Sequence, residues 1–138
     1  MGKKGMKWIL LIMFFSGATM ALAGQNNWFL IANEIEDALH GAMISYEAGK
    51  VSDAMEKVAD AYFGIFEGDK ANMEIAVRRF ISLKRVIELE KGFGDLRKAM
   101  FAKAPPADIK KQTTNLIETL KNAAKELDRK GVGLSSSQ

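Results

Sequence analysis

Apolar residues recur every three to four positions along most of the chain, a spacing that predicts helices rather than strands. The pattern indicates four helices, at residues 27–48, 51–67, 72–102 and 108–130. Gly49 and Gly68 follow the first two helices, and the Pro105–Pro106 pair separates the last two, as expected of residues that end helices. Because the connections are short, neighbouring helices should run antiparallel. We therefore expect an all-α fold, an up-down four-helix bundle.

The third predicted helix is long and carries two apolar stripes on nearly opposite faces. The first stripe consists of Met73, Ala76, Val77, Phe80, Leu83 and Ile87, and the second of Leu89, Phe93, Leu96 and Met100. Gly92 and Gly94 lie where the phase changes, which predicts a bend, or a change of packing partner, near residues 88 to 94. The alternative is that the second stripe forms the seam of a homodimer.

The first 23 residues have the layout of a secretory signal peptide. Lys3, Lys4 and Lys7 precede an apolar run, and Ala21-Leu22-Ala23 fits a cleavage site for signal peptidase. We therefore predict export to a bacterial periplasm, and the alternative is a chain anchored by an uncleaved N-terminal helix. The domain boundaries follow from this reading. They are a signal peptide at 1–23, a helical bundle domain at 24–130 and a flexible tail at 131–138.

Charge and composition exclude several classes of function. The chain has 20 Lys and Arg against 17 Asp and Glu. Three of the lysines belong to the predicted signal, so the remaining chain is neutral overall and nucleic-acid binding is not expected. The chain has no Cys, which excludes disulfides and thiolate metal sites. With one His and no Cys, we expect a protein that is not an enzyme.

Acidic residues are the main candidates for chemistry. Asp60 and Glu67 share one flank of the second helix, and Glu74 follows directly after the turn at its end. Carboxylates together with one imidazole suit a hard or borderline cation such as iron or manganese. Glu36 and His40 lie one turn apart on the first helix and are further candidate ligands. A complete di-iron site needs two acid–His pairs, whereas this chain has a single His. The alternative is a solvated charged face.

Two residues of the second and third helices have other candidate roles. Glu90 is a candidate metal ligand, with an ion pair to Arg97 as the alternative. Phe63 lies on the polar side of its helix, between Asp60 and Glu67, where an aromatic ring is out of place. An exposed ring of this kind is typical of a contact for a second protein.

Two segments resemble a known family. AYFGIFEGDKANMEIAVRR at 61–79 and LKRVIELEKGFGDLRKAM at 83–100 are similar to the extracytoplasmic N-terminal domain of bacterial high-affinity iron permeases. The family's motif is found here as Tyr62-Phe63, Phe66-Glu67, Met73-Glu74, Leu89-Glu90, Phe93 and Leu96-Arg97. The Arg-Glu-Gly-Leu-Glu motif of the permease helices does not occur in this sequence, so transport itself is not expected.

The resemblance implies an exported, non-enzymatic module that binds or delivers iron, as Fe²⁺ or Fe³⁺. It also implies a partner, either a membrane iron permease or another periplasmic iron-uptake protein. Asp60, Glu67 and Glu74 would then hold the ion, and Phe63 would contact the partner. The alternative from a different class is a metal-free helical module that docks a periplasmic or membrane partner.

Overall fold

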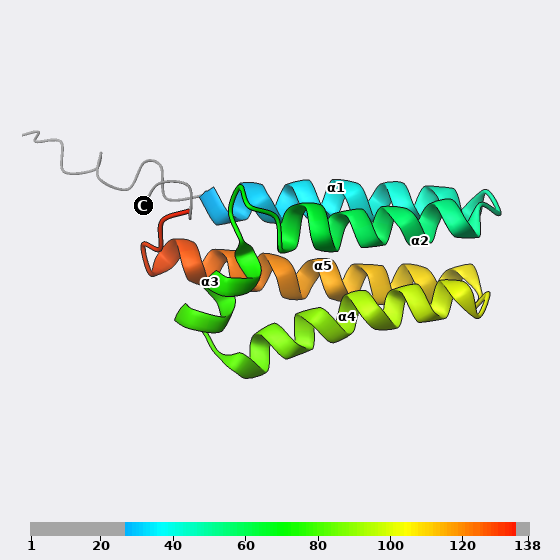
Figure 1. Ribbon diagram of the computed structural model, residues 1–138. Helices are drawn as coiled ribbons and strands as arrows, with labels where there is room; N and C mark the ends of the chain where they lie inside the picture. Colours follow the sequence, from blue (N-terminus) through cyan, green and yellow to red (C-terminus); the bar gives the residue numbers. More distant parts are fainter. Residues whose placement is uncertain (1–26, 135–138) are drawn as a thin grey trace, which may run out of the picture.

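The computed structural model describes residues 27–134, and these form one body of packed helices (Figure 1). Residues 27–134 contain no strand, so the all-α class is confirmed. The predicted signal peptide or anchor, and residues 135–138 of the predicted tail, lie outside the described residues. The elements are α1 (Asn27–Glu47), α2 (Val51–Asp60), the π-helix η3 (Ala61–Phe66), α3 (Met73–Phe80), α4 (Leu83–Phe101) and α5 (Pro106–Arg129).

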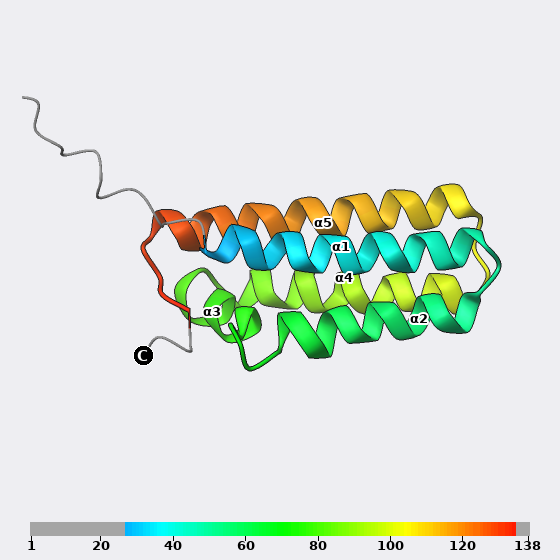
Figure 2. The same cartoon turned by 90° about the horizontal axis from the view of Figure 1, so that it is seen from above.

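Four long helices lie side by side, and α3 is a short addition at one end (Figures 1 and 2). α1 packs on α2 and α5, and α4 packs on the same two helices. The start of α1, the end of α5 and α3 share one end of the body, while the α1–α2 and α4–α5 turns lie at the other (Figure 2). Within residues 27–134, no helix combines the length and the apolar character that crossing a bilayer requires.

The core lies between the long helices and uses the apolar stripes expected of α1 and α5. Burying each large side chain contributes about 2 kcal/mol to stability. The start of α1 is fixed from the opposite helix, because the carboxylate of Asp128 accepts the backbone N–H groups of Trp28 and Phe29, each at 2.9 Å. The α1 and α5 core residues are Trp28, Ile31, Ala32, Ile35, Leu39, Ala42, Tyr46, Ile109, Leu116, Ile117, Leu120, Ala123, Ala124 and Leu127.

The predicted long third helix is wrong, because the chain breaks at Ile81–Ser82 into α3 and α4. Ser82 has extended backbone, and its side chain accepts the N–H of Arg85 at 3.0 Å, so it caps a new helix. α4 continues without a break through residues 88–94, the segment for which the bend is predicted. A Cβ at Gly92 would lie 2.8 Å from Leu116 Cδ1. That glycine therefore lets α4 approach α5 closely.

The break also redistributes the two apolar stripes of that segment. Leu89, Phe93, Leu96 and Met100 are at most 2% exposed. They belong to the core and cannot form the predicted homodimer seam. In the other stripe, Met73, Ala76 and Val77 are buried, but Phe80, Leu83 and Ile87 are 38%, 54% and 50% exposed. The rotation between α3 and α4 turns these three side chains away from the core.

The beginning of the predicted tail lies against the helices. Trp28 Nε1 donates to the carbonyl oxygen of Val132 at 2.6 Å, and Val132 and Leu134 pack against the core. The described part of the predicted tail, residues 131–134, thus closes the end of the body at which α1 begins.

Candidate functional site

The second predicted helix ends in a π-helical segment. In η3 the N–H of Glu67 donates to the carbonyl of Tyr62, five residues earlier, at 2.8 Å. π-Helical turns are rare and occur frequently at functional sites. This turn buries Phe66 completely, keeps Tyr62 half-buried and leaves Phe63 63% exposed. The expected exposure of Phe63 is therefore confirmed.

An aromatic cluster holds Tyr62 in place. Its ring centroid lies 5.2 Å from that of Phe93 on α4 and 4.8 Å from that of Phe63, both edge-on. Phe66 packs against the rings of Tyr62 and Phe93, and its ring centroid lies 5.4 Å from that of Phe93. Edge-to-face pairs at these separations are favourable beyond the area that they bury. The phenol ring is therefore positioned by contacts from η3 and α4 together.

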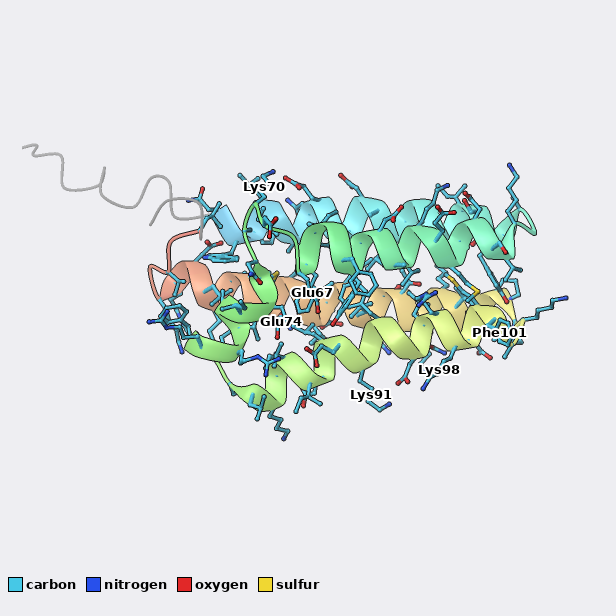
Figure 3. All side chains as sticks on the ribbon, viewed as in Figure 1. Glu67, Lys70, Glu74, Lys91, Lys98 and Phe101 are labelled. Atoms are coloured by element: carbon cyan, nitrogen blue, oxygen red, sulfur yellow. The ribbon has the colours of Figure 1, made fainter. Side chains whose placement is uncertain are left out.

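A tight turn then brings Glu74 back towards Glu67. A Cβ at Gly68 would lie 2.2 Å from the backbone oxygen of Gly64, so only glycine allows the chain to turn here. The N–H of Asn72 donates to the carbonyl of Gly68 at 2.8 Å, and Asn72 adopts a left-handed conformation with φ of 52°. In Figure 3 Glu67 and Glu74 lie close together, between the end of η3 and α4.

Burial and nearby carboxylates raise the pKa of the Tyr62 hydroxyl. Burial, and next a hydrogen bond to Glu67, raise the pKa of Tyr62 well above the ordinary value of a phenol. The negative charges of Glu67, Glu90 and Glu74 raise that pKa further. We name Tyr62, Glu67, Glu74 and Glu90 the tyrosine–acid cluster. Tyr62 lies in η3, Glu67 follows directly after η3, Glu74 lies in α3 and Glu90 lies in α4.

Arg78 joins this cluster as its counter-charge. Arg78 Nε donates to Glu74 at 3.0 Å, and a terminal nitrogen also contacts Glu74 and lies 3.5 Å from Glu90. The hydrogen bond to Glu74 raises the pKa of Arg78. The Glu74 side chain is only 13% exposed, whereas that of Arg78 is 48% exposed. Glu90 thus pairs with Arg78, a contact that sequence reasoning missed in favour of Arg97.

The other predicted ligands lie elsewhere. Glu36 forms an ion pair with Lys121 of α5, and His40 is exposed on α1. Asp60 is exposed at the end of α2 and is not among the carboxylates that act on Tyr62. Across residues 27–134, no group of three or more His, Cys, Asp or Glu is placed to share a metal ion as the side chains stand. In the tyrosine–acid cluster, Arg78 lies between two of the carboxylates.

A small cavity opens beside the cluster. It measures about 140 Å³ and is lined mainly by apolar groups. A wider, open groove of about 670 Å³ between α4 and α5 contains none of the predicted site residues. The small cavity is lined by Ala59, Tyr62, Phe63, Glu90, Phe93, Gly94 and Arg97.

Comparison of the chain with family models, with curated proteins and with solved structures finds no match. The similarity to the permease domain therefore stays a prediction from the sequence. The structure adds a geometric fact about the residues that carry it. Glu74 and Glu90, from separate parts of that motif, both contact Arg78, and Glu90 and Tyr62 line the cavity that Phe63 borders.

Proposed function

We propose that the chain is an exported, non-enzymatic module that binds or delivers iron and works with a membrane iron permease or another periplasmic iron-uptake protein. The observation that carries this proposal is that Glu74 of α3 and Glu90 of α4 share the guanidinium of Arg78, beside Tyr62 and its partner Glu67. Carboxylate oxygens suit hard cations. The metal site is thus the tyrosine–acid cluster, without Asp60 or the pair on α1.

Arg78 has a defined part in this proposal. In the metal-free state its guanidinium neutralises Glu74 and Glu90, which would otherwise repel each other. Its side chain is half exposed, so it can swing into solvent when a cation takes its place. A phenol is protonated at neutral pH even at its ordinary pKa near 10, and burial and nearby carboxylates raise the pKa of Tyr62 above that value. Tyr62 therefore orients Glu67 by donating a hydrogen bond, and the carboxylates are the ligands.

The four long helices α1, α2, α4 and α5 form, in this proposal, an up-down four-helix bundle to which α3 is added. The packing of α1 and α4 on the same two helices supports it. The addition of α3 brings Glu74 and Arg78 over the side of the bundle.

Calorimetric titration of the full chain with Fe(II) in the absence of oxygen, and with Mn(II), tests the metal site. We expect binding that a Glu67→Gln/Glu74→Gln double variant weakens by at least about tenfold. Arg78→Gln should strengthen binding, because the competing cation is gone. Glu88→Gln is the matched control, since Glu88 lies on α4 and pairs with Arg85. No binding, or binding that the double variant leaves unchanged, would overturn the proposal.

The exposed ring of Phe63 favours a second candidate, a metal-free module that docks a partner protein. Phe63 borders a cavity large enough for a small apolar side chain, with Glu90 and Arg97 at its rim. This candidate predicts no heat in the metal titrations and binding to a purified permease that Phe63→Ser abolishes. Phe101→Ser is the matched control, because that ring is also exposed but lies at the other end of the body (Figure 3).

A further inference from the structure

The α3–α4 junction presents an apolar surface that no described element covers. Phe80, Leu83 and Ile87 are among its members, and Ile75 on α3 is 50% exposed as well. We name these four residues the junction surface. A soluble helix normally turns such side chains to the core. The junction of α3 and α4 lies toward the end of the body where α1 begins and α5 finishes (Figures 1 and 2).

Basic residues frame this surface. Residues 75–87 include Arg78, Arg79, Lys84 and Arg85. Arg78 pairs with Glu74 and Glu90, and Arg85 pairs with Glu88, so Arg79 and Lys84 contribute most of the positive charge of this surface. Arg79 lies over the Phe80 ring at 5.3 Å, and Lys130 from the end of α5 donates to the Phe80 carbonyl at 2.7 Å. Apolar side chains flanked by Lys and Arg are typical of helices that lie in the headgroup region of a membrane.

The place of this surface in the chain points to the same occupant. The apolar run at residues 8–15 precedes α1 by less than twenty residues of sequence, and Trp28 at the start of α1 lines a cavity together with Ile75 and Phe80. In the alternative given above, where the N-terminal run is not cleaved and stays in the bilayer, this end of the body is kept close to the lipid.

A second copy of the chain fits the surface less well. In a two-fold symmetric contact the same patch meets itself, so the basic residues of one copy would face those of the other. Four side chains also bury far less area than a stable interface of about 1,600 Å². We propose that the junction surface rests on an anionic lipid bilayer. This inference is independent of the metal site.

Single-cysteine labelling of the full chain tests this orientation, because the natural sequence contains no Cys. An environment-sensitive fluorophore is attached at Leu83→Cys or at Phe101→Cys, which lie at opposite ends of α4, about 27 Å apart. Both native side chains are exposed, so neither label disturbs the core. With vesicles of phosphatidylglycerol and phosphatidylcholine in equal parts, the label at 83 should shift to the blue and be quenched by spin-labelled lipid. The label at 101 should remain in water.

Charge reversal sharpens the test. In the labelled Leu83→Cys chain, Arg79→Glu/Lys84→Glu should lower the ratio of lipid-exposed to water-exposed label about tenfold or more. Lys110→Glu/Lys111→Glu, near the start of α5 at the other end, is the matched control and should leave the ratio unchanged. Three results would overturn the proposal. These are a label at 83 that stays in water, equal effects of the two charge reversals, and shielding of the label without vesicles as protein concentration rises, which would indicate a second copy.

Discussion

Two connections in this molecule fold a helix back along its neighbour, and they do so by different means. Between α1 and α2 the chain reverses within residues 48–50, with Gly49 at a φ of 81°. Between α2 and α4 it passes through η3, a left-handed Asn72, α3 and a second break at Ser82. In the first connection, no candidate metal ligand contacts another. The second brings together the whole tyrosine–acid cluster.

The difference shows what irregular backbone does here. A regular helix puts side chains of one flank in a row, so acids at helical spacing on one helix face outward together. The second connection instead brings Glu74 of α3 and Glu90 of α4 to one guanidinium, that of Arg78. Convergence of polar groups from separate elements is what a binding site needs, and it requires the local departures at Gly68, Asn72 and Ser82.

The largest expected effect is on the free energy of unfolding, and it differs between two Phe residues on opposite faces of η3. Phe66→Ala should lower the free energy of unfolding by about 4 kcal/mol, because it empties a fully buried site under Tyr62 and Phe93. Phe63→Ala, three residues earlier, should lower it by only about 1 kcal/mol, since that ring is exposed and loses mainly its edge-on contact with Tyr62. Urea denaturation measures both. Equal losses would mean that η3 does not turn these rings to opposite sides.

The sequence predicts the regular connection well and the irregular one in part. α1 and α5 match their predicted ranges closely, because long amphipathic stripes end there at Gly49 and Pro105–Pro106. The split at Ser82 was missed, although Ser82 before Leu83 is a helix-start signal and the stripes change phase. Gly92 and Gly94 led us to predict the change of direction at residues 88–94, whereas the helix breaks at Ile81–Ser82.

For the site, helical spacing identified acids but not their surroundings. Glu67 and Glu74 were identified because the turn between them was recognised. Asp60 shares a flank with Glu67 in a regular helix, but the π-helical turn of η3 separates the two positions. The role of Arg78 depends on how α3 packs on α4, a tertiary contact that no local pattern reports.

The second prediction concerns the tight turn after η3. Gly68→Ala should cost about 3 kcal/mol of stability, because its Cβ would overlap the backbone oxygen of Gly64, which cannot move aside without breaking η3. Gly64→Ala is the matched control, since nothing lies within 4 Å of a Cβ there. Thermal unfolding of both variants measures the difference. If Gly68→Ala were as stable as the control, the close approach of the two glycines would be wrong.

The third prediction tests the continuity of α4. Gly94→Ala should stabilise the protein by about 0.5–1 kcal/mol, because nothing lies within 4 Å of the added Cβ and alanine favours helix. Gly92→Ala should not share this gain, since its Cβ meets Leu116. A bend at residues 88–94 would instead make both substitutions harmful, and denaturant unfolding distinguishes the two cases.

The fourth prediction concerns the titration of Tyr62, in the second connection, and the stability of the protein at alkaline pH. In a Tyr46→Phe chain the only tyrosine is Tyr62, and its tyrosinate absorbance should appear at a pH above the ordinary range of a phenol. Because the folded pKa is raised, the contribution to stability is present below the unfolded pKa near 10 and is lost as pH rises through the folded value. Glu67→Gln should lower the titration midpoint. An unchanged midpoint would remove Glu67 from the cluster.

The smallest expected effect concerns Asp53, next to the first connection. Its contribution to stability is lost as the pH falls, whereas that of Tyr62 is lost as the pH rises. Hydrogen bonds from Ser45 and then Lys57 lower the pKa of Asp53, whose carboxylate lies 2.9 Å from Lys57 Nζ. A depressed folded pKa contributes stability above the unfolded value of 3.8, and this is lost as pH falls through the folded value.

Ser45→Ala should therefore flatten the acid limb of stability against pH, whereas Ser52→Ala, an exposed neighbour, should leave it unchanged. Because the Asp53 side chain is 46% exposed, solvent screens the pair and the change should be modest. A steep acid limb that survives in Ser45→Ala would place the acid-sensitive interaction in the second connection instead, among the carboxylates around Tyr62.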